Sequence, residues 1–385
     1  MNSTKRTCQT ILKDSRLIVI KIGSVLVRGD TLDKVNQEWM DALASDIQNL
    51  QNQGKKVVIV SSGGVALGRK ALNIAPDIAP DSIPLAKKQA ASAVGQYHIF
   101  NGYFKAFAKH GIDAAQVLLT MSETENRRMS LNARETLYTL LDNGIVPVIN
   151  ENDTVSTGEI RFGDNDRLSV RVAQMILADT VVLLSTTDGL YTDNPDKDPQ
   201  AQHIPLIEQL TAEHTKMAGE ALAGLSTGGM KSKIEAATSA TKSGIHLIIT
   251  EGRKNGGLND LCNDTNKKSS LFLAKKCDSN ARKIWLSTHM NPKGYATIDD
   301  GAQNALKNGK SLLPIGVSSI DGDFKRGDVI EVKTLSGHKI AMGLSAYNAE
   351  DARRIIGKNS ADIHEILGYT GRNELIHRND MVLES

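Results

Sequence analysis

Lysines and carboxylates gather in a few glycine-containing segments of this sequence, in a pattern suited to binding a phosphate group. Residues 224–233 read Gly-Leu-Ser-Thr-Gly-Gly-Met-Lys-Ser-Lys and lead into a predicted helix that continues to about Lys242. Such a turn offers backbone N–H groups and a helix N-terminus to an anion, and Lys231 and Lys233 would neutralise it. It is not a Walker A loop, because Met230 stands where that motif has its lysine. A flexible loop before a surface helix would explain the same residues.

Two further segments supply charges for the same chemistry. Lys21 lies near the end of an apolar strand, just before Gly23, so its ammonium would project into a crevice at the sheet edge. The simpler reading is a surface lysine whose alkyl chain covers apolar neighbours. Residues 163–166, Gly-Asp-Asn-Asp, precede a helix predicted over 167–177. An acid there could cap the helix, or it could hold two ammonium groups in register.

Two polar segments that follow apolar strands are suited to an amino-acid ligand. Residues 61–64, Ser-Ser-Gly-Gly, offer hydroxyl and amide groups to a carboxylate. Residues 150–153, Asn-Glu-Asn-Asp, offer acceptors to an ammonium group, Asp153 above all. A plain strand-to-helix turn and a polar loop are the alternative readings of these two segments.

Composition and missing motifs exclude several classes of protein. The formal net charge is only +2, so nothing in the overall charge predicts binding to nucleic acid or to an anionic membrane. The nine histidines show no metal-ligand spacing, and neither a Gly-x-Ser-x-Gly elbow nor a Gly-x-Gly-x-x-Gly fingerprint occurs. Cys8, Cys262 and Cys277 lack paired spacing, and the N-terminus lacks a signal-peptide core, so we expect free thiols and a cytoplasmic protein.

The segments described above follow the strands of a predicted α/β unit. Short runs rich in Val, Ile and Leu alternate with helical periodicity from Arg16 to about Gly252, which predicts a mainly parallel sheet covered by helices on both faces, a three-layer sandwich. Ligands of such sheets bind beyond the carboxyl ends of the strands. The predicted strands are 17–22, 56–60, 115–119, 145–150, 180–184 and 246–250, and the predicted helices between them include 35–50 and 86–110.

The pattern of apolar and polar residues changes after Gly252. A polar stretch follows, and from about His289 short strands alternate with glycine turns, as in the hairpin expected over 329–344. We expect a main domain over 1–262, a linker or edge segment over 263–288, and a small all-β domain over 289–385.

The glycine-rich and charged motifs form a recognisable set. In order along the chain they read VIKIGS, VSSGGVALG, LNARETL, VPVINENDTV, FGDNDRLS, DGLYT and LSTGGMKSK, and they resemble the glutamate-phosphorylating branch of the amino-acid kinase family over nearly the whole chain. After His289, GYATIDDGA, SLLPIGV, FKRGDVIEV and GLSAYN resemble a PUA domain, a small all-β pseudo-barrel.

The resemblance implies roles for particular residues. Lys21 and Lys233 would contact the transferring phosphoryl group, and Asp166 would organise them. Ligands of glutamate would be Ser62, Asp153 and Asn165. Contacts to ATP would come from Ser185, Thr186, Thr227, Gly228, Gly229, Met230, Lys231, Ser232 and Lys233, and no residue is predicted as a metal ligand. Thr186 stands where an acid is common in the family, which predicts an altered nucleotide affinity.

The resemblance also implies an activity and its partners. We expect ATP-dependent phosphorylation of the γ-carboxylate of L-glutamate, with Mg²⁺, as the first step of proline biosynthesis. Proline as a feedback inhibitor, a homo-oligomer and a glutamyl phosphate reductase partner are further expectations.

Two alternatives remain open. One is another kinase of the same fold that acts on a carbamate, an acetylated amino acid or a nucleoside monophosphate. The other is an RNA-binding regulatory protein that uses its PUA domain. Charge argues against RNA, because residues 289–385 hold 12 Lys and Arg against 13 Asp and Glu.

Overall fold

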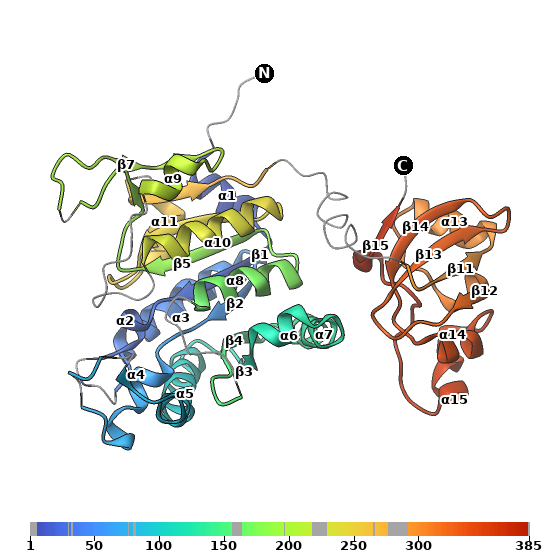
Figure 1. Cartoon of the computed structure of the whole chain (residues 1–385), viewed down its shortest axis with the longest axis horizontal. Coiled ribbons are helices and arrows are strands. Elements are labelled where there is room, and N and C mark those ends of the chain that lie inside the picture. The colour runs from blue at the N-terminus through green and yellow to red at the C-terminus, as the bar shows by residue number, and fades with distance from the viewer. Residues whose placement is uncertain are drawn as a thin grey trace. The chain divides into compact units, whose positions relative to one another are not determined.

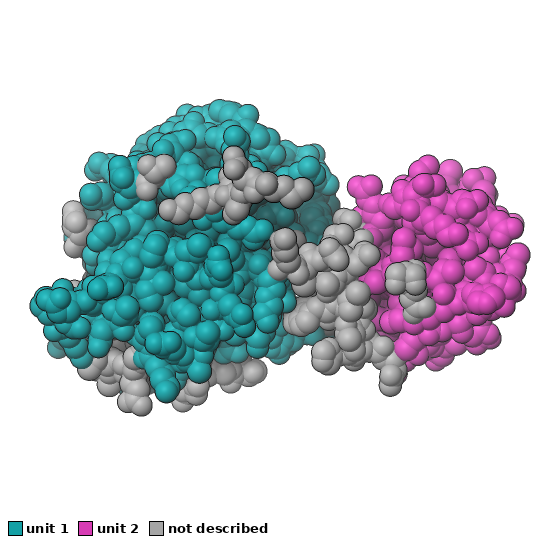
Figure 2. All heavy atoms as spheres, turned by 90° about the horizontal axis from the view of Figure 1, so that it is seen from above, with its two compact units in different colours: residues 1–275 teal, residues 276–385 magenta. Residues whose placement is uncertain are grey.

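The chain forms two compact units, 1–275 and 276–385, which Figure 2 colours separately. The structure is a computed structural model, and it describes residues 6–29, 31, 34–75, 77–79, 82–155, 164–195, 197–217, 229–264, 266–275 and 292–383. Within these ranges no helix combines the length and the apolar character needed to cross a membrane.

An eight-stranded sheet forms the centre of the first unit (Figure 1). Its order is β3-β4-β2-β1-β5-β9-β10-β8, and all neighbours are parallel except β9 and β10. The strands are β1 Leu17–Ile22, β2 Lys56–Val60, β3 Ala114–Leu119, β4 Val146–Glu151, β5 Thr180–Ser185, β8 Leu206–Ile207, β9 His246–Glu251 and β10 Ser269–Phe272. The mainly parallel sheet is confirmed, and each predicted strand is present to within one residue at either end.

Helices cover both faces of this sheet, as the apolar strands require. One face is covered by α1 Cys8–Asp14, α3 Gln37–Asn52, α5 Leu85–Ala108 and α11 Gly257–Asn263. The other is covered by α7 Arg127–Asp142, α8 Asp164–Met175 and α10 Met230–Lys242. Shorter elements complete the unit: α2 Ser24–Val27, α4 Gly64–Gly68, the 3₁₀ turn Lys70–Leu72, α6 Met121–Glu125, α9 Ala212–Met217, and the hairpin of β6 Leu190–Tyr191 and β7 His203–Ile204.

Strand order places the ligand-binding edge at β1. The chain passes from β1 to β2 on one side, whereas β5 is added on the other side of β1. Such a reversal opens a crevice beyond the carboxyl ends of the two strands that flank it. Lys21 lies near the end of β1 and Ser185 ends β5, so both border this crevice.

Helix α8 begins three residues earlier than the sequence predicts. The expected start was Arg167, but the helix starts at Asp164, so Asn165 and Asp166 belong to its first turn. Negative charge is favourable there because it faces the positive end of the helix dipole. The acids of this segment were therefore correctly placed near the helix N-terminus, but as helical residues.

Glycines allow α4 and α5 to cross with their backbones in contact. A Cβ at Gly68 would lie 1.8 Å from the carbonyl oxygen of Ala91, and a Cβ at Gly95 would lie 1.9 Å from that of Gly64. No side chain fits at such distances. The turn before α4 also needs glycine, because Gly63 has a φ of 108°.

The second unit is built on a five-stranded sheet of order β12-β11-β13-β14-β15. Its pairs are antiparallel except for β11 and β13, and the predicted hairpin is present as β13 and β14. The sequence did not predict that helices pack into its core. Strands are β11 Gly294–Ile298, β12 Val317–Gly322, β13 Val329–Thr334, β14 Lys339–Leu344 and β15 Met381–Leu383. Helical elements are α13 Asp300–Lys307, α14 Ala349–Ile355, α15 Ile363–Leu367 and the 3₁₀ turns Pro314–Gly316, Ser360–Asp362 and Arg378–Asp380.

Strand β10 lies inside the range 263–288 that was expected to be a linker or an edge segment. It pairs with β9 on one side and with the two-residue strand β8 on the other. Both of its neighbours are thus contributed by the first unit, which runs to residue 275.

The helix crossing makes a stability prediction. Gly95→Ala should lower the free energy of unfolding by about 1–3 kcal/mol, because the new methyl group forces α4 and α5 apart. Without this contact, alanine would stabilise a helix relative to glycine. Urea unfolding should show the loss, while Ala93→Ser on the exposed side of the same helix should leave stability nearly unchanged. A Gly95→Ala protein as stable as the parent would contradict the crossing.

Candidate active site

Two lysines and one aspartate form a buried cluster at the end of β1. The Nζ of Lys21 lies 2.6 Å from Asp166 Oδ1, and the Nζ of Lys233 lies 3.4 Å from Asp166 Oδ2. Ser232 donates a further hydrogen bond of 2.9 Å to Asp166 Oδ2. Asp166 has no exposed surface, and the two lysines are 7% and 5% exposed. The structure therefore brings together the three residues predicted to act on the phosphoryl group.

Strand and helix periodicity explain why these side chains meet. Lys21 has the same parity along β1 as Leu17 and Val19, whose side chains pack in the core on the α8 and α10 side of the sheet. Asp166 lies in the first turn of α8 and Lys233 in the first turn of α10. Because α8 contacts both β1 and α10, all three charged groups face one point.

The charges in the cluster control each other's ionisation. Burial alone would raise the pKa of Asp166, but the charges of Lys21 and Lys233 and hydrogen bonds from Lys21 and Ser232 outweigh it and hold that pKa below its usual value. Burial, and then the charge of Lys21, lower the pKa of Lys233, which Asp166 partly offsets. Two positive charges against one negative charge leave a net charge of +1. A bound anion would complete the balance.

Asn165 lies beside this cluster and faces the ends of β2 and β4. Its Nδ2 donates to Ser62 Oγ at 2.8 Å, to the Ser61 carbonyl at 3.0 Å and to Asn150 Oδ1 at 3.3 Å. Its Oδ1 is buried and has no hydrogen-bond partner among the described residues, which omit 156–163. An unsatisfied buried acceptor is costly unless a ligand donates to it. Asn165 and Ser62, two of the predicted glutamate ligands, are thus in direct contact.

Asp153, the third predicted glutamate ligand, is also buried at this edge. Asp153 follows β4, which pairs in parallel with β2 through Val60 and Ile149. It therefore lies at the same edge of the sheet as Ser62, beyond the carboxyl ends of the strands. Ser92 of α5 donates a hydrogen bond to its carboxylate, and Gln96 of α5 donates to the Glu151 carbonyl at 2.7 Å. Helix α5 thereby fixes the loop that carries Asp153.

The predicted nucleotide contacts are only partly described. Thr227 and Gly228 lie outside the described residues. Gly229 precedes α10, and Met230, Lys231, Ser232 and Lys233 form its first turn. Lys231 is exposed, in contrast to Lys233, and does not join the buried cluster. Of the other predicted pair, Ser185 is 9% exposed and Thr186 is exposed.

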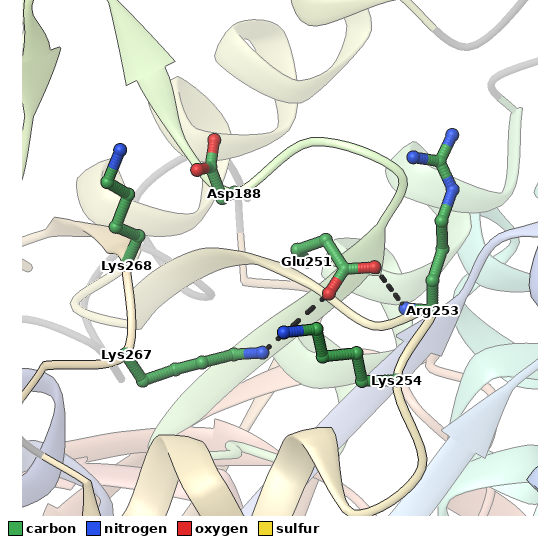
Figure 3. A pocket seen from close by; sticks show the side chains of 6 residues that line it. All are labelled: Asp188, Glu251, Arg253, Lys254, Lys267 and Lys268. Carbon is green, nitrogen blue, oxygen red and sulfur yellow. Dashed lines mark hydrogen bonds and ion pairs between the residues drawn. The ribbon is translucent and has the colours of Figure 1, made fainter.

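A cavity of about 430 Å³ lies beyond β5 and β9, next to Ser185 (Figure 3). Glu251, at its centre in Figure 3, is the sheet neighbour of Ser185. The Glu251 carboxylate accepts a hydrogen bond from the backbone N–H of Arg253 and lies 3.8 Å from Lys267 Nζ. Four cations and two acids give the lining a net charge of +2: Arg253, Lys254, Lys267, Lys268, Asp188 and Glu251. The cavity suits a polyanion.

Sequence reasoning missed this cavity. Its cations come from two adjacent pairs, Arg253-Lys254 and Lys267-Lys268, which look like ordinary surface charges. The available signal was position: the first pair comes three residues after the end of a predicted strand, and the second pair directly precedes β10. Because β10 itself was not predicted, nothing in the sequence placed the second pair at this edge.

Known proteins resemble the chain over both units. The model of the amino acid kinase family matches residues 16–251, and that of the PUA domain matches residues 294–367. Proteins named glutamate 5-kinase from Brucella ovis and Brucella abortus are 47% identical over 374 residues, which is 97% of this chain and 97% of each of theirs. A solved UMP kinase from Bacillus anthracis is 13% identical, with a TM-score of 0.48 over 68% of this chain and 97% of its own.

The buried cluster makes a prediction about stability and pH. Asp166→Asn should lower the free energy of unfolding at pH 7 by about 3–5 kcal/mol, because it leaves two buried ammonium groups without their partner. The folded pKa of Asp166 is depressed, so its contribution is present above the unfolded value of about 3.9 and is lost as the pH falls below it. The gap between the two proteins should therefore persist from pH 8 to 5 and shrink below about pH 4.

Urea unfolding at several pH values measures this gap. Ser232→Ala is the matched control, because it removes one hydrogen bond to the same carboxylate and should cost only about 1 kcal/mol. An Asp166→Asn protein as stable as Ser232→Ala at pH 7 would show that the ion pairs contribute little.

Proposed function

The chain belongs to the amino acid kinase family, and from this premise we propose that it phosphorylates the γ-carboxylate of L-glutamate with ATP. The observation that carries the proposal is the buried cluster of Lys21, Asp166 and Lys233. On one side of it lie Ser62, Asp153 and Asn165, and on the other lies the cationic cavity beside Ser185. Activity as a glutamate 5-kinase also agrees with the relatives that bear this name.

Electrostatics explains how such a site works. The γ-carboxylate of glutamate has a pKa of about 4.3 and is ionised near pH 7, so its attack on the γ-phosphorus of ATP needs no general base. A carboxylate oxygen bonds to phosphorus while the bond to the ADP oxygen breaks. The obstacle is repulsion between two anions. Lys21 and Lys233, held in place by Asp166, offset the charge that the phosphoryl group carries in the transition state.

Asp166 makes these lysines effective. Each ammonium is buried and already oriented, so little reorganisation is needed when the phosphoryl group arrives. With both carboxylate oxygens engaged by the two lysines and Ser232, Asp166 is a poor candidate for a metal ligand or a proton acceptor. We therefore propose that Mg²⁺ enters with ATP, bound to its phosphates, as part of the substrate.

The amino-acid pocket would recognise the ammonium and the α-carboxylate of glutamate. Asp153 would accept from the substrate ammonium, and Asn165 Oδ1, which has no partner within the part of the chain that the structure describes, would supply a second acceptor. Ser62 and the amides of the Gly63 turn would donate to a carboxylate. Proline carries the same α-carboxylate and an ammonium, which supports the expectation that it competes for this pocket as an inhibitor.

The position of the cationic cavity supports the residues that we assign to ATP binding. The first turn of α10 and Ser185 would contact the nucleotide, and the polyphosphate would meet the cations beyond β5 and β9. Thr227 and Gly228 remain predicted contacts. The product is an acyl phosphate, which hydrolyses readily, and this supports the expected reductase partner. The dependence of the reaction on ATP supports the expected cytoplasmic location of the protein.

The role of the lysines can be tested directly. Lys21→Ala and Lys233→Ala should each lower kcat by roughly 10²- to 10³-fold, the effect of losing one preorganised donor. Glutamate-dependent hydroxamate formation, with hydroxylamine trapping the acyl phosphate, measures this rate. Lys242→Ala, which changes an exposed lysine in the last turn of the same helix, should be near normal.

Two outcomes would contradict the proposal. Near-normal turnover in both lysine variants would remove the cluster from the reaction. Phosphorylation of a carbamate, an acetylated amino acid or a nucleoside monophosphate in preference to glutamate would assign the cluster to another kinase of this fold.

We also propose that the protein is a homo-oligomer. Strand β3 is an edge of the main sheet, and its sequence AAQVLL has neither the charges nor the proline that protect an edge. Helix α5, which packs against β3, exposes Tyr97 by 67% and Phe104 by 52%, one heptad apart on one face. Leu118 of β3 is 37% exposed. An isologous contact between two copies would cover this surface.

Sedimentation of a double variant tests this arrangement. Tyr97→Asp with Phe104→Asp should lower the measured molecular mass, because each of the two copies would bury two carboxylates in the twofold contact. Leu335→Asp, at an equally exposed apolar residue of the second unit, should leave the mass unchanged. A parent protein that sediments as a monomer would refute the proposal.

A further inference from the structure

The segment between β9 and α11 joins the cationic cavity to helix α3. Its first residue, Gly252, donates its N–H to the Ser185 carbonyl at 2.9 Å. Arg253 and Lys254 follow and line the cavity (Figure 3). Gly256, with a φ of 76°, turns the chain into α11. The two cations are therefore held only as firmly as the backbone of residues 252–257, which we call the cation loop.

Helix α3 fixes the first residue of the cation loop and the start of helix α11, which follows the loop. Trp39 Nε1 donates to the Gly252 carbonyl at 2.6 Å. Asp46 Oδ2 accepts from the backbone N–H groups of Leu258 and Asn259, both at 3.2 Å. Trp39 and Asp46 are seven residues apart and so lie on the same face of the helix. Neither residue lines the cavity.

Asp46 is a carboxylate in unusual surroundings. It is 6% exposed, and burial raises its pKa to about 6, although the hydrogen bonds from Asn259 and Leu258 act against this shift and the charge of Asp260 adds to it. Cys262 and, across a small hollow, Lys254 are the other ionisable groups near it, and Lys55 acts on Cys262. Asp46 thus changes its charge within a range in which most carboxylates stay ionised.

The hydrogen bonds of Asp46 depend on that charge. A bond from an N–H group to a carboxylate is about twice as strong as one to a neutral oxygen. Protonation of Asp46 therefore loosens the junction of the cation loop with α11. The connection to α3 through Trp39 is independent of pH.

We infer that Asp46 is a positioning residue for the nucleotide: its ionised carboxylate holds the cation loop so that Arg253 and Lys254 face the phosphates of ATP. The inference rests on the proposed function, because it takes ATP to occupy the cavity. Protonation of a group outside the cavity then weakens nucleotide binding.

Isothermal titration calorimetry with MgATP tests this at pH 7.5 and pH 5.5. Asp46→Asn mimics the protonated carboxylate, so its Kd should exceed that of the parent by roughly three- to tenfold at pH 7.5. At pH 5.5 about three-quarters of the parent is protonated at Asp46 before ATP binds, and because binding favours the ionised form, the ratio should fall to about 1.5–3. A ratio of Kd values cancels the titration of ATP itself. Asp41→Asn, on the same helix but paired with Lys109, should give a ratio near one at both values.

Thermal unfolding and kinetics separate positioning from a structural defect. Because the folded pKa of Asp46 is raised, the neutral form is the one that folding favours between about pH 4 and 6. Asp46→Asn should therefore be at least as stable as the parent at pH 7.5, and its KM for ATP should rise while the KM for glutamate and kcat stay constant. Trp39→Phe should raise the Kd for MgATP by the same ratio at both pH values.

Comparing Lys254→Ala with Asp46→Asn distinguishes a failure of the inference about Asp46 from a failure of the proposed nucleotide site. If Lys254→Ala weakens MgATP binding but Asp46→Asn does not at pH 7.5, the inference is wrong and the cavity assignment stands. If Lys254→Ala has no effect on a parent that binds MgATP, the cavity is not the nucleotide site and the inference falls with it. A ratio that is the same at pH 5.5 as at pH 7.5 would overturn the inference, because the role of Asp46 would then not depend on its charge.

Discussion

The whole site depends on one buried carboxylate shared by two ammonium groups. Asp166 has no contact with solvent, and its charge is tolerable only because Lys21 and Lys233 are next to it. The requirement acts in both directions, since neither lysine could be buried there alone. Strand β1 and helices α8 and α10 must therefore pack in one register, because a shift of any of them would leave a charge unpaired. Packing β1, α8 and α10 in the native register therefore also assembles the charged cluster of the site.

This cluster also divides the edge of the sheet into two halves. On the β2 and β4 side, hydroxyl, amide and carboxylate groups surround Asn165, whose contacts are short and specific. On the β5 and β9 side, long cationic side chains surround an open cavity. The first arrangement suits a small ligand of fixed shape, and the second suits a flexible polyanion. The strand reversal at β1 places the positive cluster between them, where the two ligands would meet.

The sequence predicted the parts of the site that follow from strand ends and helix starts. Lys21, Ser62, Asp153 and Ser185 each lie at or just beyond the carboxyl end of a Val- and Ile-rich strand, and such strands are easy to recognise. The burial of Lys21 and Lys233 could not be read this way, because it depends on how α8 and α10 pack. Arg253 and Lys268 lie on segments ordered by β10 and α11, whose pattern is too short to identify. The helices of the second unit were missed for the same reason.

The glycine crossing between α4 and α5 has a mechanical consequence. Main-chain atoms of the two helices approach each other directly at Gly68 and Gly95, so a displacement of either helix meets the backbone of the other at these points. Helix α4 starts where the turn of Ser62 ends, and α5 extends for 24 residues, about 36 Å. A ligand that displaces this turn would therefore press on a rigid rod, and the exposed side chains of Tyr97 and Phe104 on that rod would feel the occupancy of a pocket that they do not touch.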